Sequence, residues 1–160
     1  MLIRAFRQHD LVPLTELTID TFRPFYEDSF RPLVGEAVFA NQHGDWREDY
    51  RRQLAGLHAP ERHAHVAVAD AGDGLAGYVA WSVVPERRNG SITLLAVSPL
   101  HRRAHVGTAL CEHAFAALRA AGAEVVEIGT GGDPFHAPAR ALYEALGCTP
   151  LPVTVYYREL

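Results

Sequence analysis

The sequence predicts an α/β fold in one domain, on the strength of three observations. Short runs rich in β-branched residues and alanine occupy the middle of the chain, as in buried strands: HAHVAVAD, LAGYVAWSVV and SITLLAV. Segments with apolar residues at helical spacing lie before and after these runs. The length of 160 residues suits one ordinary domain, and no repeat or linker divides it. We expect residues 1–160 to form a single domain, whose mixed, mostly antiparallel sheet of six to seven strands is flanked by about four helices.

The N-terminal third is predicted to be mainly helical after one short strand. Ile3–Phe6 is an apolar stretch typical of a strand, and Asp10 can cap the helix that follows. The apolar positions of that helix repeat at helical spacing: Leu11, Leu14, Leu17 and Phe22. Pro24 is expected to end or kink it. Residues 25–57 are rich in aromatic and charged side chains and are broken by proline and glycine, which indicates further helices and loops.

Turn signals divide the central runs into three antiparallel strands. Ala71-Gly72-Asp73-Gly74 separates the first run from the second, and Asn89-Gly90 separates the second from the third. A helix follows, with apolar residues every four positions until Gly122: Val106, Leu110, Ala114 and Leu118. The strand EVVEI, the glycine-rich loop GTGGDPFHA, a helix between Pro138 and Gly147, and a last strand at Val153–Tyr157 complete the order.

The composition excludes several classes of protein. Apolar residues make up 48% of the chain and charged residues 21%, which is typical of a globular protein. A net charge of -4 argues against general nucleic-acid binding. The N-terminus MLIRAFRQHD lacks the apolar region of a signal peptide, and no apolar run reaches the ~18 residues of a membrane span, so we expect a cytoplasmic protein without membrane contact. The two cysteines, Cys111 and Cys148, have no ligand-like spacing and are expected to be buried free thiols.

The densest basic cluster of the chain, HRRAHVGTAL at residues 101–110, stands just before the most regular helix. A helix N-terminus leaves backbone N–H groups unpaired and carries the positive end of the helix dipole, which suits it to hold a phosphate. The small residues Ala104, Gly107 and Ala109 let a ligand approach the backbone, and Arg102 and Arg103 can add charge-assisted contacts. The alternative is a solvated turn with its arginines in water.

Two motifs in order resemble those of the GCN5-related N-acetyltransferases. The acetyl-CoA loop of that family, R/Q-x-x-G-x-G/A, is similar to the segment Arg102–Gly107, in which His105 stands at the position of the first glycine. The family's N-x-x-A-x-x-L-Y-x-x-x-G-F resembles residues 136–148, in which His136 replaces the asparagine and Cys148 the phenylalanine. The resemblance runs from about Val66 to Gly147. It implies a sheet that splays between its fourth and fifth strands.

The resemblance implies direct attack of a primary amine on the thioester of acetyl-CoA, as co-substrate, without an acyl-enzyme. Tyr143 falls on the family's tyrosine, which protonates the departing thiolate; its alternative role is that of a half-buried helix aromatic. Main-chain N–H groups of the fourth strand would hold the acetyl carbonyl. The residues expected to contact the cofactor are Leu95, Ala96, Val97, Arg102, Arg103, Ala104, His105, Val106, Gly107, Thr108, His136 and Tyr143.

The general base is not evident from the sequence. Thr93 aligns with the carboxylate that many relatives carry on the fourth strand, and it cannot serve as a base. Glu127, amid Val125, Val126 and Ile128, is the first candidate, because burial would raise the pKa of its carboxyl group; its alternative is a strand-end ion pair. His63 and His65 are further candidates for the base, because they would share one face of a strand and suit a proton relay; their alternative is two histidines at the solvent edge. No third ligand has an obvious place beside them, so no metal is expected.

The acceptor pocket is expected at the loop GTGGD, which lacks both the third glycine of a dinucleotide fingerprint and the lysine of a P-loop. Asp133 is a candidate contact for a cationic amine, and the stretch Phe22–Phe39, with Glu27, Asp28 and Glu36, is expected to form the other wall. We expect an N-acetyltransferase for a small-molecule amine or a peptide terminus. The alternative is a non-catalytic acyl-CoA sensor. The resemblance also allows a homodimer, because relatives often pair through sheets or C-terminal strands.

Overall fold

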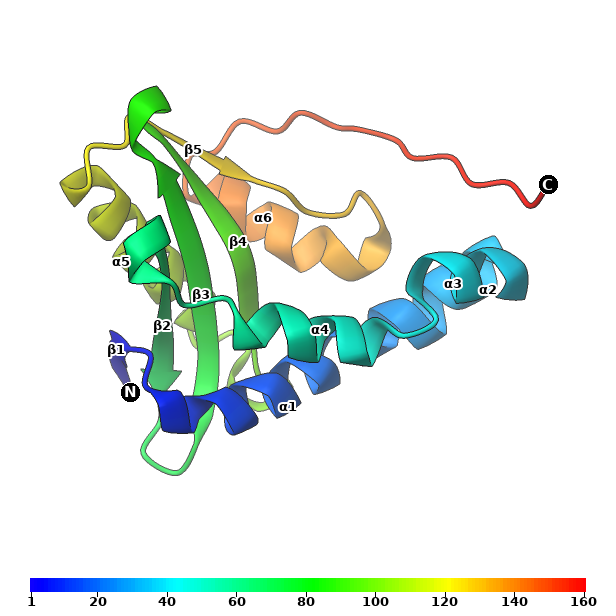
Figure 1. The fold of residues 1–160 in the computed structure, drawn as a ribbon, viewed down its shortest axis with the longest axis horizontal. Coiled ribbons are helices and arrows are strands. Elements are labelled where there is room, and N and C mark those ends of the chain that lie inside the picture. Colours follow the sequence, from blue (N-terminus) through cyan, green and yellow to red (C-terminus); the bar gives the residue numbers. More distant parts are fainter.

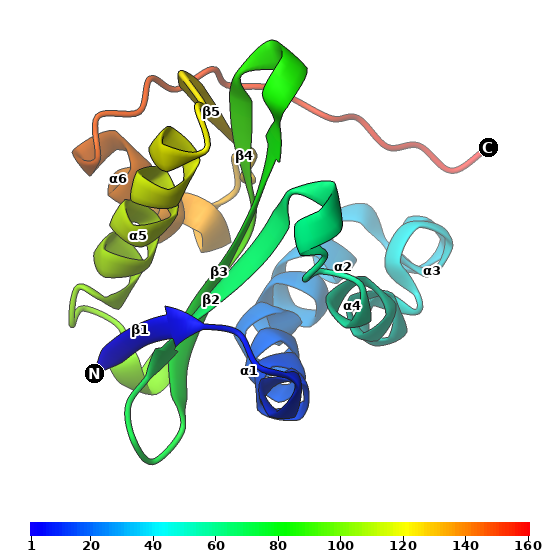
Figure 2. The ribbon, with the colours of Figure 1, turned by 60° about the vertical axis from the view of Figure 1, so that its left-hand side comes forward.

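The fold is a twisted five-stranded sheet with helices on both faces, as a computed structural model of residues 1–160 describes it (Figures 1 and 2). The strands lie in sequence order across the sheet, and all neighbours are antiparallel except the last pair, β4 and β5. The strands are β1 (Leu2–Ala5), β2 (Ala64–Asp70), β3 (Leu75–Val84), β4 (Asn89–Val97) and β5 (Val125–Ile128).

Six α-helices flank the sheet, where the sequence predicted about four. They are α1 (Leu11–Arg23), α2 (Arg31–Val34), α3 (Glu36–His43), α4 (Trp46–Ala55), α5 (Val106–Ala120) and α6 (Ala137–Ala145). The additional ones come from the aromatic stretch, in which a π-helical segment, Pro24–Phe30, joins α1 to α2. Pro24 therefore ends α1 as expected, since it has no N–H group to continue the hydrogen-bond ladder. No helix is both long enough and apolar enough to cross a membrane.

Alternation along the strands divides the core between the two faces of the sheet. On one face, Leu110, Ala114 and Leu118 of α5 pack against strand residues. On the other face, Leu14 of α1 and Leu54 of α4 pack against Val66, Val68 and Tyr78. The predicted period of four in α5 is therefore confirmed as the buried stripe of that helix. Cys111 is buried in this core, and Cys148 is half-buried at its edge.

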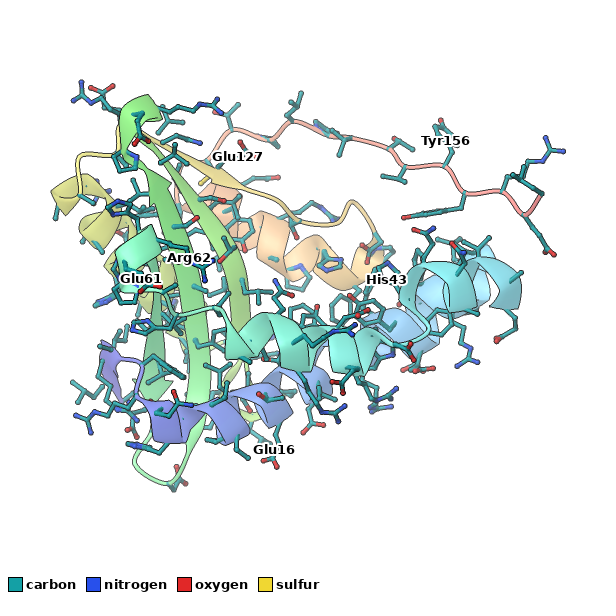
Figure 3. All side chains as sticks on the ribbon, viewed as in Figure 1. Glu16, His43, Glu61, Arg62, Glu127 and Tyr156 are labelled. Atoms are coloured by element: carbon teal, nitrogen blue, oxygen red, sulfur yellow. The ribbon has the colours of Figure 1, made fainter.

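The predicted sixth strand does not form. Residues 151–160 are exposed and unpaired, and only the ring of Tyr157 packs edge-on against Phe30, with centroids 5.6 Å apart. Tyr156 lies far out on this segment (Figure 3). Alternating apolar residues favour a strand only where a neighbour supplies the ladder, and Pro150 and Pro152 remove two donors beside it. The sheet has five strands, so the expectation of six to seven was wrong.

The Asn89-Gly90 turn was also misplaced. The chain reverses at Pro85–Arg88, where Arg88 adopts a left-handed conformation with φ 50°, and Asn89 already pairs with Val84. Gly90 lies within β4, and a Cβ atom there would come within 2.6 Å of Leu118. Gly90 is thus required for the packing of α5 on the sheet rather than for a turn. The other predicted turn is confirmed, with Gly72 at φ 94°.

The sheet opens between β4 and β5, as the resemblance implied. Pairing of the two strands is limited to Asn89–Ile92 with Val125–Ile128. The register between β3 and β4 shifts at the same point, because Ala80 pairs with Leu94 and Trp81 with Ile92, which leaves Thr93 as the extra residue of a bulge. From Thr93 to Val97, β4 therefore continues without a strand on its β5 side.

Candidate functional site

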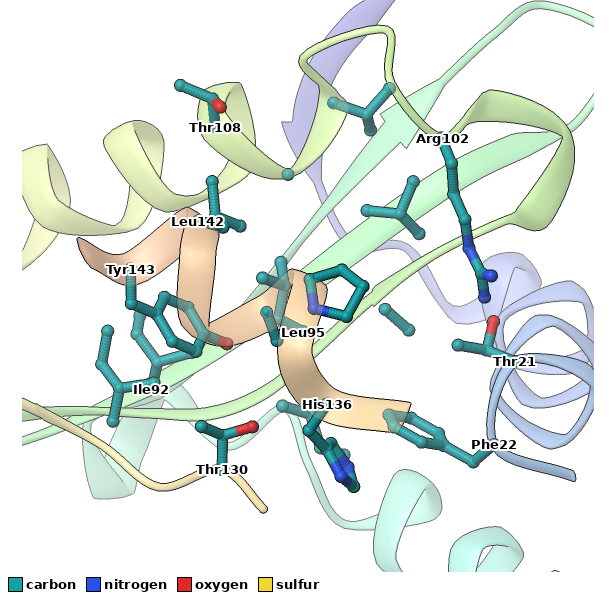
Figure 4. A pocket seen from close by; sticks show the side chains of 18 of the residues that line it. Thr21, Phe22, Ile92, Leu95, Arg102, Thr108, Thr130, His136, Leu142 and Tyr143 are labelled. Atoms are coloured by element: carbon teal, nitrogen blue, oxygen red, sulfur yellow. The ribbon is translucent and has the colours of Figure 1, made fainter. Parts of the chain in front are cut away.

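A cavity of about 920 Å³ lies where the sheet opens (Figure 4). This is within the range of pockets that hold small molecules. It is lined by the free edge of β4, the turn before α5, the loop from β5 to α6, one face of α6, and residues from α1 and α4. The cofactor residues expected from the sequence are brought together here, with the exception of Ala104: Leu95, Ala96, Val97, Arg102, Arg103, His105, Val106, Gly107, Thr108, His136 and Tyr143 all line the cavity.

The N-terminus of α5 presents unpaired backbone donors. The first N–H group of the helix with a partner is that of Ala109, which donates to the carbonyl of His105. The N–H groups of Val106, Gly107 and Thr108 have no partner in the protein. Three adjacent donors at the positive end of a fifteen-residue helix suit an anionic ligand.

The turn before α5 uses the left-handed region twice, at Arg103 (φ 62°) and at His105 (φ 57°). The glycine that the family motif has at the position of His105 adopts such a conformation without cost, whereas a residue with a Cβ atom is strained there. The loop geometry is therefore retained although the glycine is not.

We expect His105→Gly to stabilise the ligand-free protein by about 0.5–1 kcal/mol, since relief of the left-handed strain exceeds the extra chain entropy of glycine. Urea unfolding measures the difference. An unchanged or lower free energy of unfolding would show that the imidazole makes a compensating interaction.

The two guanidinium groups of this turn are not engaged in ion pairs and are available to bind a ligand. Arg102 and Arg103 form no ion pair, and no carboxylate approaches either guanidinium group within 4.0 Å. Two cavity-lining residues, Thr21 and His101, also contain buried polar atoms without a partner: Oγ1 and Nδ1 respectively. Buried polar groups in proteins are nearly always paired, so these atoms indicate contacts that a bound molecule would complete. The lining thus fits a phosphate-bearing ligand such as acetyl-CoA.

Gly107 has a second role that the sequence did not reveal. A Cβ atom at this position would lie 3.0 Å from Cδ2 of Leu142 and 3.8 Å from Cγ2 of Val97. The bare α-carbon therefore lets α6 approach the start of α5. Gly107 both lines the cavity and allows the close contact between the two helices.

Tyr143 extends from α6 into the cavity, with its hydroxyl toward the interior of the pocket (Figure 4). Burial, with smaller contributions from Cys111 and Cys148, raises the pKa of its phenol well above the ordinary value. The group therefore remains protonated across the neutral range and can donate a proton. Tyr143 thus lines the cavity, and its position beside the cofactor stays a prediction.

In the loop from β5 to α6, Asp133 and His136 contact each other, whereas the sequence analysis considered them separately. The Asp133 carboxylate caps the turn before α6, and one of its oxygens accepts from the N–H groups of Phe135 (2.9 Å) and His136 (3.3 Å). The other oxygen lies 2.6 Å from Nδ1 of His136. Asp133 is thus fully engaged within the chain and does not line the cavity, so the expected direct contact with an amine has no support.

The residues considered as bases lie elsewhere. Glu127 is exposed on the edge strand and does not line the cavity, so the expectation of a buried carboxyl was wrong, because only Val126 and Ile128 face the core (Figure 3). Its role as a base stays a prediction from the sequence alone. His63 lies in the turn before β2, and His65 stacks on Trp81 with centroids 5.7 Å apart, so the two do not share a strand face. No group of three metal-ligating side chains forms.

The aromatic stretch contributes rings, not charges, to the cavity. Phe22 lines it together with Tyr50, whose ring stacks on that of Phe22 at 5.4 Å, and with Phe135. Glu27 is bound to Trp46, Arg31 and Arg47. Arg31 also binds Glu36, and Asp28 is exposed. None of these carboxylates reaches the cavity. No local motif in the sequence marked Thr21, Tyr50 or Phe135, which chain topology brings to the site.

The fold and the cavity define an α/β protein with a pocket between a helix N-terminus and an open strand edge, where unpaired N–H groups suit an anionic ligand. The profile of the acetyltransferase (GNAT) family matches residues 16–148. The chain belongs to this family. Its enzymes use acetyl-CoA as co-substrate.

Similar proteins differ in their acceptors. The mycothiol acetyltransferase of Beutenbergia cavernae is 40% identical over 90 residues, which are 56% of this chain but only 30% of the length of that relative. An aminoglycoside 6'-N-acetyltransferase structure from Acinetobacter haemolyticus has a TM-score of 0.69 at 17% identity, covering 100% of this chain and 99% of that one. A ribosomal-protein-alanine N-acetyltransferase structure from Brucella melitensis has a TM-score of 0.66 at 16% identity, covering 99% of this chain and 100% of that one. At these identities the two structures show a shared fold alone.

Proposed function

We propose that the protein is an acetyl-CoA-dependent N-acetyltransferase in which a primary amine attacks the thioester directly. The observation that carries the proposal is one cavity shared by the unpaired N–H groups of α5, the free edge of β4 and the Tyr143 hydroxyl. These are the three parts that the reaction needs: an anchor for the diphosphate, donors for the carbonyl oxygen, and an acid for the leaving thiolate.

Each part has a distinct chemical task. The N–H groups of Val106, Gly107 and Thr108, with Arg102 and Arg103, hold the diphosphate. The edge of β4 from Thr93 to Val97 offers backbone N–H groups for the oxygen that becomes negative during attack. Holding both reactants in one cavity replaces a bimolecular encounter by a local one, which lowers the barrier by up to ~7–11 kcal/mol in favourable cases.

The cavity lining favours an acceptor that has one amine and an aromatic or apolar body. Phe22, Tyr50 and Phe135 face it, and no aspartate or glutamate lines it. A polycation such as an aminoglycoside or a polyamine would bury several charges there without a counter-charge. A monoamine loses its charge before attack, so it avoids this cost.

A panel of acceptors tests the function and the acceptor class together. We expect thiol release from acetyl-CoA with phenethylamine and related monoamines, at a kcat/KM at least tenfold above that with spermidine or kanamycin. Absence of turnover with every amine, despite cofactor binding, would favour the acyl-CoA sensor. A preference for kanamycin would contradict the acceptor class but not the reaction.

Acetyl-CoA is also expected to stabilise the protein against heat. At about a hundred times its Kd, a ligand of the folded state adds about 2.7 kcal/mol, which corresponds to a rise in Tm of roughly 5–10 °C for a domain of this size. Differential scanning fluorimetry measures the shift. An unchanged Tm at saturating acetyl-CoA would overturn the assignment of the cavity.

A further inference from the structure

The proposed reaction needs a group that takes a proton from the acceptor, because an alkylammonium ion is almost wholly protonated at neutral pH. The cavity lining contains no aspartate or glutamate, and Thr93 cannot act as a base. Three histidines line it: His101, His105 and His136. The choice of a base within the cavity therefore falls among imidazoles.

Two of these imidazoles lie beside the anion-binding turn. His101 and His105 flank Arg102 and Arg103 in the chain, and His105 is the residue that caps α5. These residues lie where the diphosphate is expected, so they are placed to contact the cofactor rather than the amine. Neither has a carboxylate partner to stabilise an imidazolium ion.

His136 has such a partner. Its Nδ1 lies 2.6 Å from Oδ2 of Asp133, and the two side chains are only 18% and 24% exposed. Although burial opposes it, the hydrogen bond and charge of His136 and two backbone N–H groups hold the pKa of Asp133 below its usual range. An ionised carboxylate only accepts hydrogen bonds, so Nδ1 must carry the proton. In the neutral ring, Nε2 then keeps its lone pair, and it has no hydrogen-bond partner in the protein.

The surroundings fix this pair in place. Arg140 donates to the carbonyl oxygens of Gly131 (2.6 Å) and Asp133 (2.7 Å), which closes the loop onto α6. The ring of Phe25, in the π-helical segment, packs edge-on against the imidazole of His136, with the ring centroids 4.8 Å apart. The charged or titratable groups near the imidazole are therefore Asp133, the guanidinium of Arg140, and Tyr143 further along α6. The π-helical segment Pro24–Phe30, which packs across from His136, contributes the aromatic ring of Phe25 to this contact rather than a charged group.

The pair stands at the start of the helix that carries the proposed acid: His136 is the N-cap residue of α6, and Tyr143 lies within α6. His136 and Tyr143 are seven residues apart, which corresponds to about 10 Å of helix rise, and both line the cavity. Figure 4 shows the two side chains in different parts of the lining, with His136 between Thr130 and Phe22 and apart from Tyr143. This spacing leaves room for the reacting amine and thioester between them.

From this geometry we infer that His136 is the general base of the proposed acetyl transfer and that Asp133 is its positioning residue. The inference rests on the proposed function. It gives His136 a role other than the cofactor contact expected from its motif position.

The protons balance over the reaction. Nε2 of His136 takes one proton from the ammonium group, and the nitrogen lone pair then forms the C–N bond to the acetyl carbon. The C–S bond breaks as Tyr143 donates its proton to sulfur. The nitrogen loses a second proton, which restores Tyr143, and the imidazolium ion releases the first proton to water. The products are the amide, the free thiol and one proton.

Two substitutions test the pair without removing its packing. We expect His136→Gln to lower kcat at pH 7 about a hundredfold with phenethylamine as acceptor. Asp133→Asn retains the oxygen that caps Phe135 and His136 but places an NH₂ group opposite Nδ1, so Nε2 acquires the proton and faces the cavity as a donor. We expect at least a tenfold loss of kcat. His113→Gln on α5 and Asp73→Asn in the β2–β3 turn make the same chemical changes outside the cavity and should leave kcat unchanged.

Two readouts separate a base from a structural residue. The wild-type rate should fall at acidic pH as the imidazole takes up a proton, and this limb should be absent in His136→Gln. The loss should shrink to less than about fivefold with β,β-difluorophenethylamine, which has the same shape but a weakly basic amine that needs no base. An equal loss with both acceptors, or an unchanged pH profile, would overturn the inference. A wild-type protein that binds acetyl-CoA but acetylates no amine would instead overturn the proposed function, and the inference with it.

Discussion

Tyr143→Phe is expected to lower kcat about 10²- to 10³-fold and to leave the Kd for acetyl-CoA nearly unchanged. The hydroxyl acts on the sulfur only as the C–S bond breaks, so its loss removes an interaction of the transition state rather than of the ground state. The ring itself packs against the core of α5 and the sheet, and phenylalanine retains that packing. Stopped-flow or steady-state thiol release, with the Kd measured separately by calorimetry, gives both quantities.

The pH dependence of the wild-type enzyme bears on the same residue. Burial raises the pKa of Tyr143, so the acid stays protonated as the pH rises, and we expect no loss of rate from its ionisation below the ordinary phenol value of ~10. Tyr156→Phe removes a phenol from the exposed C-terminal segment and provides the matched control. A Tyr143→Phe enzyme with wild-type kcat would return the side chain to a packing role.

Local signals in the sequence were sufficient for the elements that depend on local chemistry. The period of four in α5, the strands β2 and β3, and the proline after α1 follow from side-chain spacing and backbone geometry, and all three are confirmed. The basic turn in front of the unpaired N-terminus of α5 was likewise predictable, because both features are local to the chain. Its left-handed residues, Arg103 and His105, were not, since neither residue type requires that conformation.

The predictions that were wrong concern features that depend on residues distant in the chain. Whether residues 153–157 form a strand depends on a neighbouring edge, and whether Gly90 is a turn or a packing residue depends on Leu118. The exposure of Glu127 follows from which face of β5 meets the core. The pairing of Asp133 with His136 needed only three residues of separation, but the sequence did not show that the loop would close on itself.

Gly107→Glu is expected to weaken acetyl-CoA binding at least a hundredfold, which is about 2.7 kcal/mol, and to abolish the Tm shift. The new carboxylate would stand among the three unpaired N–H groups and repel the diphosphate, and it would itself satisfy those donors. Its Cβ atom also meets Leu142 at 3.0 Å, so part of the effect is steric. Calorimetric titration with acetyl-CoA measures the loss of affinity.

Two variants separate charge from shape in this result. Gly107→Ala introduces the same Cβ contact without the carboxylate, and because the terminal methyl of Leu142 can turn aside, we expect less than a tenfold loss of affinity. Ala37→Glu adds the same charge on the exposed surface of α3, outside the cavity, and should bind acetyl-CoA as the wild type does. If Gly107→Ala and Gly107→Glu lose affinity equally, the glycine serves the approach of α6 to α5, and the unpaired N–H groups do not hold the diphosphate. Equal wild-type affinity in Gly107→Glu would place the diphosphate elsewhere.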